Sequence, residues 1–522
     1  MKTTMNLTTE PWIPVTDAQG QARNVSLHEV FAAGDSLRDL AVRPHERVAL
    51  MRLLICIAQA ALDGPTDSDA LESSASKLPG AAQRYLDEWQ ESFDLFHPTM
   101  PFLQFPGLTK TPKPAKKKTS APKSGDRASD REDAKPNPVT KLDFGLSAGN
   151  KTTLFDHGAA SDEWRVMKAE QIAISLVAFQ CFAPSEIVGA AKWRKIQIAK
   201  GTASMAPCTP KAMIHAFVRR RNVFETLVAN LLTREGVKKN YQREWGKPVW
   251  EVMPTRLEPV SSPDSPTHTY LGRLVPLSRA ILLNRDKKTM TLANGLRYPT
   301  FPDFSAEPSA SVIVSKKAQS LVSAGQKQIW RQLPALVVKR LANESGGPLT
   351  LSELTPENDI DLWVGALLAT TDEGILDTVE GVYPIPARML NEPGRRAYED
   401  EVKESEHVAW KLGDACKTYR QHLELKPQGY PEKEHAFRRY WTGIEQNLPL
   451  LHASLRAADG SEEQSDALAR WRAALWSSAR DAFDSACASE TPRQRRGHAL
   501  ALRSLFKSKR QKPAETPALA PA

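Results

Sequence analysis

Hydrophobic residues recur at helical spacing through much of the first 180 positions. Residues 44–62 carry apolar side chains over a face wide enough for a buried helix, and Ser26 precedes residues 27–31 as a typical helix N-cap. Residues 77–96 predict another helix, and residues 169–182 predict a helix or a buried segment.

A short strand is predicted near the N-terminus. Residues 6–15 place Trp12 and Ile13 between prolines, and a second extended piece ends at Val25. Because proline cannot donate a ladder hydrogen bond, we expect the first strand to lie at the edge of its sheet.

The pattern changes to strands and turns between residues 271 and 314. Short apolar or alternating runs are separated by turn residues, which predicts hairpins and a small mixed sheet. The runs are residues 273–275, 280–283, 290–292 and 312–314. One hairpin tip would be formed by Asp286, Lys287 and Lys288, and residues 315–317 would end another. Farther along, residues 328–342 predict an amphipathic helix, residues 359–368 a short apolar helix, and residues 370–374 a turn.

The last quarter of the chain is helical in pattern up to its tail. Four stretches with apolar positions at helical spacing are separated by Pro or Gly: residues 395–425, 432–456, 462–489 and 493–506. An up-down four-helix bundle is the simplest packing for four such segments. The fold class we predict is therefore α+β, with a large mixed N-terminal domain of short sheets and hairpins over residues 1–390 and a four-helix bundle over residues 391–512.

Two segments are predicted to be disordered. Residues 110–139 lack apolar periodicity and are rich in Lys, Pro, Ser and Asp, so they cannot bury enough surface to offset the cost of ordering the backbone. This segment forms a basic insertion in the first domain. The tail, residues 513–522, has the same character.

Composition indicates a soluble globular protein with a polyanionic partner. The 522 residues are 41% hydrophobic, and the formal net charge is +9. Part of the excess lies in residues 110–139 and 503–512, so contact with nucleic acid should be local. The cysteines are far apart and predict free thiols in a reducing cytoplasm: Cys56, Cys181, Cys208, Cys416 and Cys487. With no signal peptide or membrane-spanning run in the sequence, we expect a cytoplasmic protein.

The sequence holds none of the common catalytic motifs. There is no His-Glu-x-x-His, no Gly-x-Ser-x-Gly and no phosphate-binding Gly-x-x-x-x-Gly-Lys-Ser/Thr, and acids such as residues 399–401 belong to a charged helix face. We therefore expect neither enzymatic activity nor a cofactor or metal ion.

Residues 146–155 are the first candidate contact with nucleic acid. Gly149 permits close approach to a ligand, and the four residues after it offer donors of the kind that meet phosphates and base edges. These donors are Asn150, Lys151, Thr152 and Thr153. On the residues alone, an ordinary surface loop with Phe155 packed into the core is the simpler interpretation.

Several uncommon residues at fixed offsets carry a resemblance to a known family. The opening Asn6-Leu7-x-x-x-Pro11-Trp12-Ile13-Pro14-Val15 is followed by Leu53 to Gln59, His97-Pro98 and Pro101-Phe102-Leu103-Gln104. In this order the chain resembles the large subunit of the type I-E CRISPR surveillance complex, Cascade. The likeness continues through residues 146–155, 216–219, 227–233 and 435–451.

The resemblance implies a non-catalytic subunit. Such a subunit recognises the protospacer-adjacent motif from the minor-groove side, promotes duplex opening and R-loop formation, and recruits a helicase-nuclease. Its expected partners are the CRISPR RNA, the other Cascade subunits and double-stranded target DNA. The loop ending at Phe155 resembles the family's link to the guide-RNA handle, with Phe155 as the subunit anchor and Asn150 to Thr153 approaching the motif.

By the same resemblance, four further groups of residues are candidate DNA contacts. They are a glycine loop (Gly189, Ala190, Ala191 and Lys192), a lysine finger (Lys288, with Lys287 as its rival), displaced-strand contacts (Lys316 and Lys317) and a strand-separating wedge (Thr371 and Asp372). Small residues suit a minor groove about 6 Å wide, because only they let main chain enter it.

This chain departs from the family at two of these groups. Two alanines replace a glycine run, and Thr and Asp replace an amide-containing wedge. A structural scaffold that binds the guide handle and partner subunits without motif readout is therefore the alternative function. A basic surface loop and solvated tip lysines are the corresponding structural alternatives.

Overall fold

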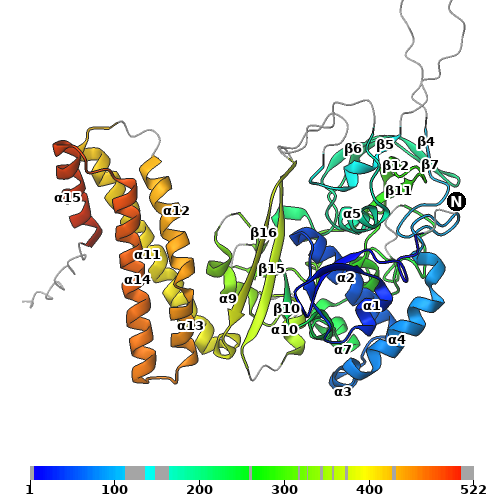
Figure 1. The fold of residues 1–522 in the computed structure, drawn as a ribbon, viewed down its shortest axis with the longest axis horizontal. Coiled ribbons are helices and arrows are strands. Elements are labelled where there is room, and N and C mark those ends of the chain that lie inside the picture. Colours follow the sequence, from blue (N-terminus) through cyan, green and yellow to red (C-terminus); the bar gives the residue numbers. More distant parts are fainter. Residues whose placement is uncertain are drawn as a thin grey trace, which may run out of the picture. The chain divides into compact units, whose positions relative to one another are not determined.

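The structure is a computed structural model of the 522-residue chain. It describes residues 5–111, 136–146, 164–257, 262–315, 318–325, 327–340, 345–354, 358–370, 374–425 and 431–506. The chain divides into two compact units, Met1–Ile385 (unit 1) and Pro386–Ala522 (unit 2), which are described separately (Figure 1).

Helix α2 (Pro44–Ala61) forms the centre of unit 1, as its apolar pattern predicts. Nearly every side chain from His45 to Gln59 is buried, because the helix is covered by α4 (Ser74–Glu88), α5 (Ala169–Phe182) and α8 (Tyr270–Leu274). The predicted N-cap is also confirmed. Ser26 accepts a hydrogen bond from the Glu29 amide at the start of α1 (Leu27–Ala32).

The prediction of an N-terminal edge strand is wrong. Strand β1 (Ile13–Asp17) lies in the middle of a three-stranded sheet, between β2 (Ala22–Val25) and β3 (Leu37–Leu40). Pro14 is tolerated there because it precedes the first residue paired with β3, and towards that strand its carbonyl accepts the Ala41 amide at 2.9 Å.

A long hairpin replaces the helix predicted at residues 359–368. Strands β15 (Ile360–Thr370) and β16 (Gly374–Ile385) pair with each other, and β15 also pairs with β10 (His215–Arg219). The apolar run is buried as a central strand, with Trp363 beside Phe217, and a short buried run has no periodicity that separates strand from helix.

Two other expectations were also wrong. The helix predicted at residues 328–342 is reduced to η6 (Ile329–Gln332) and α9 (Leu333–Leu336), and the strand predicted at residues 273–275 falls mainly in α8. Pro334 is in the first turn of α9, where proline is tolerated, but its ring interrupts a longer helix.

The remaining elements of unit 1 are short and connect these parts. Their bounds are α3 (Ser68–Glu72), η1 (Gln90–Phe93), β4 (Thr109–Lys110), β5 (Asn137–Pro138), η2 (Val139–Leu142), β6 (Glu186–Val188), β7 (Ala191–Trp193), β8 (Ile196–Ile198), β9 (Gly201–Ala203), η4 (Pro210–Ala212), α6 (Val223–Val228), α7 (Arg234–Gly236), η5 (Val237–Tyr241), β11 (Arg279–Leu283), β12 (Thr289–Asn294), β13 (Val312–Val314), β14 (Gln319–Leu321) and α10 (Thr350–Glu353). No helix among the described residues is long and apolar enough to cross a membrane.

A buried ion network ties α2 to α8 and to the segment before β13. The Glu307 carboxylate accepts from Arg52 at 2.8 Å and from the Nε of Arg273 at 3.2 Å, and all three residues are at most 2% exposed. Burial raises the pKa of Glu307, but the two arginines outweigh it and hold the pKa below its ordinary value. The network is therefore ionised in the folded protein.

Unit 2 is helical. After η7 (Ala387–Leu390), its described part contains α11 (Glu392–His422), α12 (Pro431–Gln446), α13 (Leu448–Arg456), α14 (Glu462–Ala486) and α15 (Pro492–Phe506). The helix predicted over residues 432–456 is broken at Asn447, because Pro449 in the first turn of α13 has no amide hydrogen to donate and in a continuous helix its ring would clash with the carbonyl four residues earlier. Tyr440, Trp471 and Phe483 are core residues. The predicted tail, residues 513–522, lies outside the described residues.

Candidate nucleic-acid interface

The tip of the β11–β12 hairpin carries Lys287 and Lys288, as the sequence predicts. Leu283 pairs with Met290, and Lys287 adopts a left-handed conformation with φ of 55°. Asp286 stabilises the turn. Its carboxylate accepts from the Lys288 amide at 2.9 Å, and from the Thr289 amide and hydroxyl at 3.0 and 2.7 Å. Burial opposes ionisation of Asp286, yet these hydrogen bonds hold its pKa below the ordinary value.

Main-chain hydrogen bonds fix this tip to two neighbouring segments. The Lys287 carbonyl accepts from the Met167 amide at 3.0 Å, and the Lys288 carbonyl accepts from the Val139 amide at 2.9 Å. The Lys288 side chain is exposed, and that of Lys287 is half-buried. A lysine presented on such a braced turn keeps its position with little loss of backbone entropy when it meets a phosphate or a groove.

Because Asp286 holds the turn, Asp286→Ala should destabilise unit 1 by about 1–2 kcal/mol, the expected loss for several hydrogen bonds made by one carboxylate. Denaturant unfolding measures this. Asp264→Ala is the matched control, since Asp264 is exposed in a turn and its carboxylate makes no hydrogen bond within the described part of the chain. Equal unfolding free energies for the two variants would contradict the assigned role of Asp286.

The predicted glycine loop is mostly regular structure. Ala191 and Lys192 belong to β7, which pairs with β4 and β8, so the irregular loop expected there is reduced to Gly189 and Ala190. The Ala191 side chain is fully buried. Lys192 is exposed on the opposite face of β7, because successive side chains of a strand alternate.

The fold does not require glycine at position 189. A Cβ added there would meet the Lys110 Cε at 3.4 Å, which is an ordinary contact. Next to it, the Ala190 carbonyl accepts from the Thr111 amide at 3.0 Å. The half-buried main chain at Gly189 thus carries no side chain although the local packing leaves room for one.

Strands β4 and β5 connect the two candidate groups. Lys110 pairs with Ala191, and its ammonium donates to the Asn137 side chain at 3.5 Å. Asn137 in turn pairs with Met290, beside the lysine tip. We call Gly189, Lys110, Asn137, Lys287 and Lys288 the lysine face. Lys192 is not part of it.

Lys110 and Asn137 were missed as site residues, because they lie within residues 110–139, which were predicted to be disordered. That prediction is wrong at both ends, since Lys110 is in β4 and residues 137–138 form β5. Residues 112–135 are outside the described residues. No local signal marks these two-residue strands, because each is stabilised only by partners distant in sequence.

The other predicted contacts lie outside the described residues. They are Asn150, Lys151, Thr152, Thr153, Phe155, Lys316, Lys317, Thr371 and Asp372. Strands β13 and β14 flank Lys316 and Lys317, and β15 and β16 flank Thr371 and Asp372. In Figure 1 the closed end of the β15–β16 hairpin and strands β5 and β6 all lie towards the top of unit 1.

A hollow beside Arg43 in unit 1 is unsuited to nucleic acid. It has a volume of about 590 Å³ and is lined in part by Glu46, Asp143, Glu170 and Glu380, with Arg43 as its basic residue. Arg43 is already paired with Glu46 and Asp143 at 2.6 Å each. The surplus carboxylates would repel phosphate.

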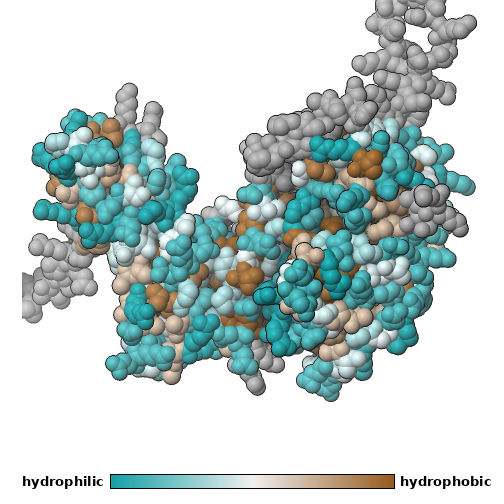
Figure 2. All heavy atoms as spheres, in the orientation of Figure 1, coloured by the Kyte–Doolittle hydropathy of each residue, from teal (hydrophilic) through white to brown (hydrophobic). Residues whose placement is uncertain are grey.

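Figure 2 shows a mainly hydrophilic surface over the visible face of unit 1, interrupted by small hydrophobic spots.

Within the part of the chain that the structure describes, no group of three or more His, Cys, Asp or Glu residues could hold a metal ion. All five cysteines are buried and free. Neither finding identifies a catalytic centre.

Comparison with known proteins gives consistent matches over nearly the whole chain. A family model described as CRISPR-associated protein Cse1 matches residues 6–482. The CRISPR-associated protein CasA/Cse1 of Thermus thermophilus is 25% identical over 511 residues, covering 92% of this chain and 91% of that protein.

Solved structures show the same fold. Thermobifida fusca Cse1 matches with a TM-score of 0.74 and 20% identity over 96% of this chain and 98% of that one. Cse1 from Acidimicrobium ferrooxidans matches with a TM-score of 0.72 and 19% identity over 97% of each chain. A chain of a CRISPR RNA-guided surveillance complex matches with a TM-score of 0.69 and 20% identity, over 97% of this chain and all of that one.

Proposed function

This chain belongs to the CRISPR-associated protein Cse1 family, and from that premise we propose that it is the non-catalytic large subunit of a type I-E CRISPR RNA-guided surveillance complex. In this role it recognises the protospacer-adjacent motif of target DNA through the minor groove. It then promotes duplex opening and R-loop formation and recruits a helicase-nuclease. Sequence specificity beyond the motif is left to pairing with the CRISPR RNA.

The lysine face is the structural observation that supports this proposal. It combines an exposed lysine on a braced turn with a stretch of main chain that lacks a side chain, and Lys110 and Asn137 join the two. A minor groove about 6 Å wide admits lysine side chains, and main chain that carries no side chain can approach its floor closely. The surface thus has the two elements that motif readout from the minor groove requires.

The test is motif-dependent DNA binding by the assembled complex. The preferred flanking triplet is first selected from a randomised target library, and affinities are then measured for duplexes with that triplet and with a scrambled one. We expect Lys287→Ala/Lys288→Ala to weaken binding to the selected duplex about tenfold, roughly 1.4 kcal/mol, and to make binding less sensitive to salt. Lys238→Ala/Lys239→Ala removes an equal charge from an exposed pair outside the lysine face and should have little effect.

Gly189→Ala tests whether the main chain at position 189 approaches the minor groove, separately from any effect on the stability of the chain. Since the added methyl group has room in the folded chain, the free energy of unfolding should change by less than about 1 kcal/mol, while affinity for the selected duplex falls. Unchanged affinity in both the Gly189 and the lysine variants would exclude the lysine face as the reader. If the unmodified complex binds selected and scrambled triplets equally well, the scaffold function applies instead, as the alanines after Gly189 suggested.

A further inference from the structure

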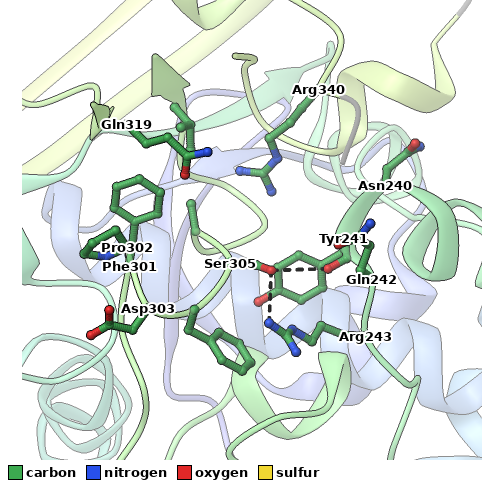
Figure 3. Close-up of a pocket in the computed structure, with 13 residues that line it drawn as sticks. Asn240, Tyr241, Gln242, Arg243, Phe301, Pro302, Asp303, Ser305, Gln319 and Arg340 are labelled. Carbon is green, nitrogen blue, oxygen red and sulfur yellow. Dashed lines mark hydrogen bonds between the residues drawn. The ribbon is translucent and has the colours of Figure 1, made fainter. Parts of the chain in front are cut away.

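A separate hollow of about 180 Å³ lies in unit 1 between three segments of the chain (Figure 3). Residues 240–243 and 301–306 form most of its wall, and Val312, Gln319 and Arg340 complete it. An engineered cavity of roughly 150 Å³ accepts benzene, so this hollow has room for a small polyatomic ion but not for a whole nucleotide.

Two arginines point into the hollow from opposite sides (Figure 3). Arg340 is 5% exposed, and its guanidinium donates to the main-chain carbonyls of Ala310 at 3.1 Å and Glu307 at 3.4 and 3.5 Å. Arg243 lies 3.7 Å from the centre of the Phe304 ring and donates to the Ser305 hydroxyl at 3.3 Å. Among the described residues, neither guanidinium is paired with a carboxylate.

The surrounding charges do not neutralise these arginines. Glu307 is the nearby buried carboxylate, and its side chain already binds Arg52 and Arg273. Asp303 is on the exposed rim, and Figure 3 shows its carboxylate directed away from both guanidinium groups. Burial lowers the pKa of Arg340 to about 10 and also lowers that of Arg243, so both cations are desolvated without a matching anion.

Polar atoms for which the described residues supply no hydrogen-bond partner also line the hollow. They are the Tyr241 hydroxyl, the Asn240 side-chain carbonyl and the Arg243 Nε. Tyr241 is only 2% exposed, and its hydroxyl points into the hollow beside Arg243 in Figure 3. Burial raises the pKa of Tyr241 to about 12, which keeps the hydroxyl protonated as a donor. Tyr241 ends the π-helical turn η5, and such turns occur often at functional sites.

We propose that this hollow is a phosphate-binding site, in which Arg340, Arg243 and the Tyr241 hydroxyl donate to the phosphate oxygens. The N–H groups of the two guanidinium groups that the main-chain carbonyls and Ser305 leave unused, together with the Tyr241 hydroxyl, match the several acceptor oxygens of phosphate, and the enclosed volume limits the bound part to the phosphate group itself. Nucleic-acid backbone and free phosphate monoester share this chemistry. The proposal is independent of the lysine face and of motif readout.

Binding of inorganic phosphate to the purified full-length chain tests the proposal. Calorimetric titrations at constant ionic strength, with chloride as the reference anion, compare the unmodified chain with Tyr241→Phe and Arg243→Gln. Because the Tyr241 hydroxyl has no hydrogen-bond partner among the described residues, Tyr241→Phe should fold normally yet bind phosphate several-fold more weakly. Arg243→Gln should weaken binding at least tenfold, the effect of losing a charged hydrogen-bond donor.

Arg256→Gln is the matched control, since Arg256 is an exposed arginine outside the hollow. It should bind phosphate as the unmodified chain does. A thymidine dinucleotide and thymidine 5′-monophosphate then identify the source: backbone phosphate if the dinucleotide competes, monoester if only the mononucleotide does. The proposal is overturned if phosphate binds no better than chloride, or if both hollow variants match Arg256→Gln.

Discussion

Replacing Glu307 with alanine should lower the free energy of unfolding of unit 1 by about 3–5 kcal/mol, the loss expected when one partner of a buried ion network is removed. In this variant Arg52 and Arg273 remain buried, but the carboxylate that accepts hydrogen bonds from both and neutralises their charges is gone. Because these arginines lie on α2 and α8, the strain falls on the centre of the unit. Denaturant unfolding of the full chain, followed by a probe specific to unit 1, measures the loss.

Two further variants serve as controls for Glu307→Ala. Glu10→Ala removes an exposed carboxylate of the same unit and should change stability by less than about 0.5 kcal/mol. Glu307→Gln keeps the shape of the side chain but not its charge, so its free energy of unfolding should lie between those of Glu307→Ala and Glu10→Ala. If Glu307→Ala loses no more than Glu10→Ala, the network does not hold α2 and α8 together.

Acidification should destabilise unit 1 through two buried histidines, His45 and His215. Burial is the largest cause that lowers the pKa of each to about 4, against an ordinary value near 6.5 in the unfolded chain. The unfolded state therefore binds protons first as the pH falls, and stability present above pH 6.5 is lost between pH 6.5 and 4. Each histidine can contribute a loss of up to about 3 kcal/mol, at about 1.36 kcal/mol per pKa unit.

Charges around the histidines do not reverse this sign. Glu46 and Asp143 favour protonation of His45 and Arg43 opposes it, while Arg52 opposes and Glu307 favours protonation of His215. Their net effect is smaller than that of burial. The carboxylates of Asp143 and Glu307, whose pKa is lowered in the folded chain, also contribute less to the free energy of unfolding in acid. Their contribution falls only below about pH 4.5, where carboxylates of the unfolded chain become protonated. Between pH 6.5 and 4.5 the loss therefore comes mainly from histidines; His268, whose pKa burial also lowers, adds to it, and Glu353, whose pKa burial raises, opposes it.

His45→Phe provides the check on the pH dependence. The centre of the imidazole ring lies 5.4 Å from that of Phe144 and 6.3 Å from that of Phe182, and no described residue forms a hydrogen bond with its Nδ1, so an aromatic replacement fits the site. Unfolding free energies at pH 7.5, 6.0 and 5.0 should fall less steeply in this variant than in the unmodified chain. Identical slopes would show that the pKa of His45 does not change on unfolding.

Local patterns predicted some elements well because those elements depend on local interactions. Helix α2 is apolar on nearly all sides, Ser26 has its capping partner three residues away, and Asp286 to Lys288 form a turn between two apolar runs. The failures share a different cause. Residues 360–370 become a strand because β10 supplies a partner from 145 positions earlier, counting from His215 to Ile360, and no nearby residue carries that information.

The candidate site was predictable only in part, for the same reason. Lys287, Lys288 and Gly189 could be named from turn chemistry and family resemblance. Lys110 and Asn137 could not, since each joins the lysine face through pairing with β7 or β12. The phosphate hollow had no sequence signal, because Arg340 is almost a hundred positions from Tyr241 and Arg243 and joins them only in the folded unit.

Strands β4 and β5 bring positions far apart in the sequence to neighbouring points of the fold. Lys110 and Asn137 contact each other there. The free energy of closing a chain segment between two fixed points rises only slowly with the length of the segment, so extra residues inserted between positions 111 and 136 should scarcely change the stability of unit 1. A fluorophore introduced with such an insertion would be tethered to the lysine face through Lys110 and Asn137, and its signal could follow the arrival of a duplex in real time.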